Sequence, residues 1–106
     1  MLVPPRIILA AIASYQFVIE NSTIELDCEV VADPKPTFIW FKNGIEVNTT
    51  YISTSSHSSQ MILRDISIDD AGNYTCFSRN VVGNVSTQST NIIVYSEFIN
   101  INANQK

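Results

Sequence analysis

Apolar and polar residues alternate along most of this chain, so that every second side chain belongs to the same face. The alternation is clearest from Ile24 to Val30, where acidic residues separate the apolar ones. Shorter runs with the same period span Phe38–Phe41, Met61–Arg64 and Asn73–Arg79. A period of two is the spacing of a β-strand with one buried face and one solvated face. We therefore predict a strand in each of these four segments.

Turn-forming residues separate the predicted strands. Asn43-Gly44 supplies the positive φ angles of a tight hairpin turn. The other breaks are Asp33–Pro36, the polar stretch Ser53–Ser59, which we interpret as a loop, and Asn80–Gly83. No segment shows a sustained helical repeat. Short strands separated by frequent turns predict an all-β sandwich or barrel.

The apolar run Ile7–Ala13 near the N-terminus has two interpretations. It follows Arg6 and ends in Ala-Ile-Ala, which is similar to a signal-peptide core and cleavage site. However, the run is at the short limit for a signal peptide, and Pro4 and Pro5 precede it. Proline is tolerated on an edge strand, so we favour a first strand here. Whether residues 1–13 are that strand or a signal remnant remains open.

The patterning divides the chain into three parts. Residues 1–3 are interpreted as a leading segment or linker start, with Met1 as an added initiator, and residues 4–95 as one domain. The Asn-rich stretch 96–106 lacks a clear pattern, so we interpret it as a C-terminal linker or tail.

Composition narrows the possible partners. A chain of 106 residues has room for one domain and one core, and 45% apolar with 15% charged residues is typical of a globular protein. The net charge is −4, and Lys and Arg occur only singly. Nucleic acids and anionic membranes require a clustered basic surface, so neither is expected as a partner. No apolar stretch reaches the roughly 18 residues of a membrane span, so no direct membrane insertion is predicted.

The residues that could carry catalysis do not form a recognisable catalytic pattern. The single histidine, His57, lies among serines in the predicted loop, where nothing holds a nucleophile, a base and an orienting group in place. Two adjacent carboxylates such as Asp69 and Asp70 would suit an acid pair or a metal site, but a structural role in a turn is the stronger interpretation. Cys28 and Cys76 have no Cys or His partner at zinc-binding spacing. We predict no catalytic residue, no cofactor and no metal site, and therefore no enzyme.

Cys28, Trp40 and the run Asp70-Ala71-Gly72-Asn73-Tyr74-Thr75-Cys76 form a specific combination in this order and spacing. With them the chain resembles the immunoglobulin superfamily, most closely its intermediate (I-set) domain type, over residues 4–95. Only 22 residues separate Trp40 from Leu63, too few for the extra strands of an antibody variable domain. Asn21 stands where the family usually has glycine, and asparagine tolerates the left-handed geometry of such a turn. Further matching stretches are Pro5–Ile7, Asp33–Gly44, Met61–Cys76 and Asn80–Gly83.

The resemblance implies an immunoglobulin-like β-sandwich of two antiparallel sheets, joined by a Cys28–Cys76 disulfide that packs against Trp40. Closing a loop of about 49 residues would stabilise the fold by about 4 kcal/mol on the chain-entropy estimate. Tyr74 is placed to bond back to the backbone as a tyrosine corner, and Asp70 to support the turn before that strand. The structural core implied by the resemblance comprises Trp40, Leu63, Asp70, Gly72 and Tyr74.

Four Asn-x-Ser/Thr sequons occur, at Asn21, Asn48, Asn73 and Asn84, where the composition would give roughly two by chance. Together with a paired-cysteine framework they favour the secretory route. We expect an extracellular domain at the cell surface, within a larger membrane protein. Asn48 and Asn84 are the sequons most expected to carry glycan, because they fall in surface loops.

The resemblance implies a non-catalytic protein-binding module of a cell-surface adhesion or receptor protein, with neighbouring immunoglobulin-like or fibronectin-type domains. The partner is a protein, in either homophilic or heterophilic contact. The alternatives are a spacer domain of an extracellular matrix protein, or an intracellular sarcomeric or cytoskeletal domain. For the binding face, the outward residues of two neighbouring strands are the candidates, because interface centres favour aromatic residues and Arg. They are Ile39, Phe41, Phe77 and Arg79.

Overall fold

The computed structural model describes residues 1–10, 15–48 and 51–96. Within these ranges none of the helices is long and apolar enough to cross a membrane. The elements, in chain order, are β1 (Val3–Ala10), β2 (Tyr15–Ile19), β3 (Ile24–Asp33), β4 (Thr37–Lys42), β5 (Ile45–Val47), β6 (Ile52–Thr54), β7 (Ser58–Leu63), the 3₁₀ helix η1 (Ile68–Asp70), β8 (Gly72–Arg79), β9 (Asn84–Ser86) and β10 (Thr90–Tyr95).

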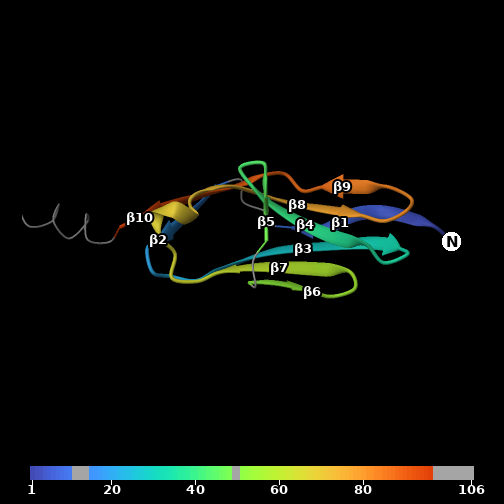
Figure 1. Cartoon of the computed structure of the whole chain (residues 1–106), viewed down its shortest axis with the longest axis horizontal. Helices are drawn as coiled ribbons and strands as arrows, with labels where there is room; N and C mark the ends of the chain where they lie inside the picture. Colours follow the sequence, from blue (N-terminus) through green and yellow to red (C-terminus); the bar gives the residue numbers. More distant parts are fainter. Residues whose placement is uncertain (11–14, 49–50, 97–106) are drawn as a thin grey trace, which may run out of the picture.

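The strands form two sheets that face each other (Figure 1). The four-stranded sheet has the order β1-β3-β7-β6, and the six-stranded sheet has the order β2-β10-β8-β4-β5, with β9 pairing to β8. This confirms the predicted all-β, immunoglobulin-like sandwich. One pairing differs from the antiparallel expectation, because β2 runs parallel to β10. The first strand thus changes sheets, with β1 in one layer and β2 in the other.

The four segments with a period of two coincide with strands β3, β4, β7 and β8, as predicted, except that Arg64 lies just beyond the end of β7. The prediction of a loop over Ser53–Ser59 is wrong, because its first residues belong to β6, its last to β7, and the two strands pair as a hairpin. The reason is that Ser59 points into the core and finds a hydrogen-bond partner there.

Parts of the predictions for the two ends lie outside the described residues. These parts are residues 11–13 of the expected first strand and 97–106 of the expected tail. Residues 4–10 of the expected first strand belong to β1. The division into 1–3, 4–95 and 96–106 stays a prediction.

A disulfide between Cys28 of β3 and Cys76 of β8 joins the two sheets, with the Cα atoms 6.4 Å apart. Trp40 lies directly opposite Cys76 in the ladder between β4 and β8 and is only 3% exposed. The Trp40 indole Nε1 donates a hydrogen bond of 2.9 Å to Ser59 Oγ on the opposite sheet. That serine oxygen lies 3.0 Å from Thr54 Oγ1. A buried indole N–H requires a hydrogen-bond acceptor, which explains why Ser59 lies in the core.

A second set of bonds fixes the turn before β8. The Tyr74 hydroxyl donates a hydrogen bond of 2.6 Å to the Asp70 carbonyl, which is the arrangement of a tyrosine corner. At the start of η1, the Ser67 hydroxyl accepts from the Asp69 amide, and the Asp70 carboxylate accepts from the Ser67 amide at 2.9 Å. This is a capping box, which satisfies two backbone donors at the start of the helix. Leu63 is half-buried and packs against the core.

The turn between β4 and β5 is fastened to the start of β8. Asn43 and Gly44 have φ angles of +53° and +81°, as the sequence predicts for this turn. The Asn43 amide donates to the Asn73 carbonyl at 2.7 Å, and the Asn73 amide donates to Asn43 Oδ1 at 2.9 Å. Gly72 has a φ of +152°, and a Cβ placed on it would lie 2.9 Å from Asn43 Nδ2. Only glycine fits this position without displacing the turn.

We expect Tyr74→Phe to lower the free energy of unfolding by about 1 kcal/mol, because it removes a buried hydrogen bond and leaves the Asp70 carbonyl without its partner. Urea unfolding of the wild type and the variant measures this difference. Tyr15→Phe is the matched control, since the side chain of Tyr15 is exposed. Equal losses in the two variants would contradict the assigned role of the Tyr74 hydroxyl.

Burial, assisted by the nearby Asp70 charge, raises the pKa of Tyr74 from 10.0 to about 12. The folded state therefore holds the phenol proton more tightly than the unfolded state. Its contribution to stability is complete below about pH 10 and is lost as the pH rises toward about 12. We expect the stability difference between the wild type and Tyr74→Phe to shrink across this range. Urea unfolding at pH values on both sides of 10 tests this, and a constant difference would contradict it.

Candidate functional site

The outer surface of β4 and β8 is formed by the residues that alternate with the core residues of these two strands. Trp40 and Cys76 point into the core, so their chain neighbours Ile39, Phe41 and Phe77 point to the other face. In the ladder Ile39 lies directly opposite Phe77, and Phe41 lies opposite Thr75. The structure therefore brings the apolar residues chosen from the sequence onto one face.

The exposure of these residues is uneven. Ile39, Phe41 and Phe77 are half-buried, whereas Arg79 is exposed and lies opposite Thr37 at the end of the ladder. Directly opposed side chains on a sheet lie about 5 Å apart at Cβ, so Ile39 and Phe77 cover part of each other's surface. The result is a small apolar strip that ends in a cationic side chain. We call these four residues the β4–β8 face.

Two sequons flank the β4–β8 face. Asn84 on β9 lies opposite Arg79, and Asn73 precedes Thr75 on the same side of β8. Both asparagine side chains are exposed, as are those of Asn21 and Asn48. Glycans on Asn73 and Asn84 would stand at the two ends of the face and leave its centre, Phe77, between them.

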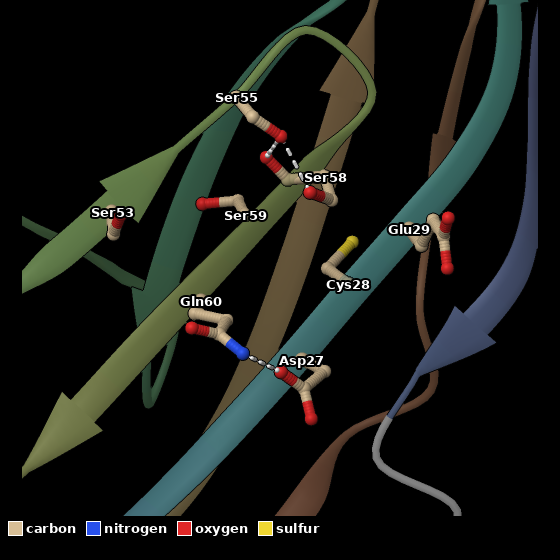
Figure 2. A pocket seen from close by; sticks show the side chains of 8 residues that line it. All are labelled: Asp27, Cys28, Glu29, Ser53, Ser55, Ser58, Ser59 and Gln60. Carbon is tan, nitrogen blue, oxygen red and sulfur yellow. Dashed lines mark hydrogen bonds between the residues drawn. The ribbon is translucent and has the colours of Figure 1, made fainter.

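A polar depression of about 390 Å³ lies on the outer side of the four-stranded sheet (Figure 2). Figure 2 shows Asp27 and Glu29 on β3 beside hydroxyl groups from β6 and β7. Gln60 donates a hydrogen bond of 2.7 Å to Asp27, and the Ser55 and Ser58 hydroxyls lie 2.6 Å apart. These side chains satisfy one another across neighbouring strands. The nearby His57 is hydrogen-bonded elsewhere, to Ala32 and Ser56.

His57 is more firmly held than its place among serines suggests. Its side chain is half-buried, and Nε2 lies 2.8 Å from the Ala32 carbonyl oxygen, while Nδ1 lies 3.1 Å from Ser56 Oγ. Because a carbonyl only accepts, Nε2 carries the proton in this contact. The imidazole thus joins the β6–β7 turn to the end of β3, whereas the sequence alone offered no reason to expect that His57 is held in place.

Asp69 and Asp70 both make hydrogen bonds that hold the turn before β8. Asp70 closes the capping box, and the Asp69 carbonyl accepts a hydrogen bond from the Lys42 ammonium. Over residues 1–10, 15–48 and 51–96, the fold gathers no group of three or more His, Cys, Asp or Glu side chains that could hold a metal ion.

The sequence reasoning missed a second exposed apolar surface, at the edge of the six-stranded sheet. Phe17 and Tyr15 on β2 are 71% and 62% exposed, and Tyr95 on β10 is 43% exposed. Phe17 lies beside Ile93, and Ile19 lies beside Tyr95 in the parallel ladder. The signal was present, since Tyr15, Phe17 and Ile19 alternate with Gln16 and Val18. It was obscured because an apolar run directly precedes it.

Comparison with known proteins gives a family match and several relatives. A family model described as "Immunoglobulin domain" matches residues 4–80. Hemicentin-1 of Mus musculus is 30% identical over 84 residues, covering 78% of this chain and 2% of that protein. Protein sidekick of Drosophila melanogaster is 32% identical over 90 residues, covering 85% of this chain and 4% of its own length. The chain thus spans a small fraction of the relatives it matches.

Solved structures show the same architecture. The titin domains Z1Z2 in complex with telethonin superimpose with a TM-score of 0.80 and 19% identity, covering 91% of this chain and 49% of that one. At this identity the likeness concerns the fold alone. The family match extends over most of the sandwich, including Cys28, Trp40 and Cys76. The chain therefore belongs to the immunoglobulin domain family.

Proposed function

We propose that this chain is a non-catalytic protein-binding module of an extracellular, cell-surface protein, and that it contacts its protein partner through the β4–β8 face. The observation that carries this proposal is the direct pairing of Ile39 with Phe77 on a solvent-facing sheet surface, beside the exposed Arg79. Aromatic residues and Arg contribute most to the centres of protein interfaces. The inner side of the same sheet packs against the hydrophobic core.

Two features favour the extracellular setting over the intracellular alternative. A disulfide joins the sheets, and disulfides persist mainly in oxidising compartments. The asparagines of all four sequons are exposed, which is the geometry a glycosyltransferase requires. A matrix spacer domain shares both features, so the binding experiment separates it from an adhesion or receptor module.

The role of the β4–β8 face is tested with Phe77→Ser. The secreted chain is coupled to fluorescent beads, and two quantities are measured: aggregation of the beads for homophilic contact, and attachment of the beads to cells for heterophilic contact. We expect Phe77→Ser to reduce the attachment of the beads to cells at least about tenfold, because it removes the central aromatic side chain. The melting temperature should fall only slightly, because Phe77 is half-exposed and outside the core.

Ile68→Ser is the matched control, since Ile68 is an exposed apolar residue on η1, away from the β4–β8 face. Equal binding by Phe77→Ser and the wild type would refute the proposed face. Absence of any contact by the wild-type chain would instead favour the spacer role.

Glycosylation tests the compartment. We expect the intact mass of the chain, secreted from a eukaryotic host, to fall after enzymatic removal of N-glycans, with Asn48 and Asn84 occupied. The reason is that both side chains are exposed. Asn84 begins the three-residue strand β9, directly after the turn at Gly83, and not in a loop as expected from the sequence. Peptide mapping identifies the occupied sites, and the variants Asn48→Gln and Asn84→Gln serve as controls. If both sites are bare, the extracellular proposal loses its main support.

A further inference from the structure

Strand β2 leaves one edge of the six-stranded sheet open. It is the terminal strand of the order β2-β10-β8-β4-β5, and no described strand pairs with its other side. The Glu20 amide donates to the Tyr95 carbonyl at 2.9 Å. In a strand, alternate residues direct their amide and carbonyl groups to the same side. Gln16 and Val18 therefore face β10, and the backbone groups of Phe17 face the open edge.

The other edges of the two sheets carry features that discourage pairing with a foreign strand. Strand β1 contains Pro4 and Pro5 and has register irregularities. Strands β5, β6 and β9 have only three residues each. Natural proteins protect their edges with short strands, prolines, bulges and charges. Strand β2 has five residues and contains no proline, glycine or charged side chain.

The open edge of β2 is also apolar. The exposed parts of Tyr15, Phe17 and Tyr95 together amount to roughly 350 Å², taking about 200 Å² for each aromatic side chain. A patch of this size on a soluble domain is often a binding surface. Beside it, a groove follows the gap between β2 and β3; it is lined by Phe17, Ile19 and Ile24 together with polar residues that include Glu25 of β3. Both the backbone and the side chains of β2 are thus available to a partner strand.

We propose that the occupant of this edge is β2 of a second copy of the chain, paired antiparallel about a two-fold axis at Phe17. Phe17 then faces Phe17 of the second copy, and Tyr15 faces Ile19 of the second copy, so aromatic and aliphatic side chains pair directly. The chain carries a net charge of −4, so repulsion between two copies is smallest where the paired strand, like β2, has no charged side chain. In this register the two Glu20 residues lie about 20 Å apart, beyond the screening length of about 8 Å.

The expected dimer is weak. Two copies of the patch bury roughly 700 Å², whereas stable complexes bury at least about 1,200 Å². Sedimentation velocity is therefore measured over a wide concentration range, up to about millimolar. The chain is used with its disulfide intact and its N-glycans trimmed to single sugars, because the sequon at Asn21 follows β2 closely. We expect the weight-average sedimentation coefficient to rise with concentration.

Phe17→Lys should weaken dimerisation at least about tenfold, because it opposes two like charges and removes the central aromatic pair. Ile45→Lys is the matched control, since Ile45 is 73% exposed on β5, at the far edge of the same sheet. It should dimerise as the wild type does, and so should Phe77→Ser, which alters the separate β4–β8 face. Melting curves show that each variant is folded.

Cross-linking provides a second readout. Residues on a two-fold axis face their own copies, so Phe17→Cys should form a disulfide-linked dimer on mild oxidation, with Cα atoms within the usual range of about 4.4 to 6.8 Å. Ile45→Cys should remain monomeric. A wild-type chain that stays monomeric at every concentration, or Phe17→Cys that cross-links no faster than Ile45→Cys, overturns the proposal. Loss of the dimer in Phe77→Ser but not in Phe17→Lys would also overturn it and assign self-association to the β4–β8 face.

Discussion

The buried indole of Trp40 and the adjacent disulfide impose the constraint from which most of this structure follows. The disulfide holds β3 and β8 at a fixed separation, and the indole N–H must find an acceptor within the space that remains. An unsatisfied buried donor would cost about 1–3 kcal/mol, so the opposite sheet supplies Ser59. That requirement places a polar residue in the core and orders the serine-rich segment around it as a hairpin.

The same constraint determines the candidate binding face. Because Trp40 and Cys76 point inward, the neighbouring residues Ile39 and Phe77 point outward. Trp40 pairs with Cys76 in the ladder, so Ile39 pairs with Phe77 one position along. The face is therefore positioned by the core behind it. The open edge at β2 belongs to the same sheet, three strands from β4, which is a separation of about 14 Å.

Sequence pattern alone predicted the strands that have one buried and one wet face, because burial and alternation coincide there, as at Leu26 and Cys28. The sequence pattern did not predict strands β5, β6 and β9, because three residues are too few to show a period. The roles of Ser59 and His57 were also hidden. Each depends on a contact with a residue far away in the chain, Trp40 for one and Ala32 for the other. The parallel pairing of β2 depends on the change of sheet by the first strand, which side-chain periodicity does not encode.

The packing of Gly72 against Asn43 has a consequence for how this sequence can change over evolutionary time. Asn43 supplies the left-handed turn and also the oxygen that receives the Asn73 amide, and its side chain occupies the space that a Cβ at position 72 would need. A mutation that adds a side chain at position 72 is therefore disfavoured for as long as asparagine remains at 43. We therefore expect the two positions, 29 residues apart in the chain, to vary together. Related domains that lack the glycine should also have remodelled the turn.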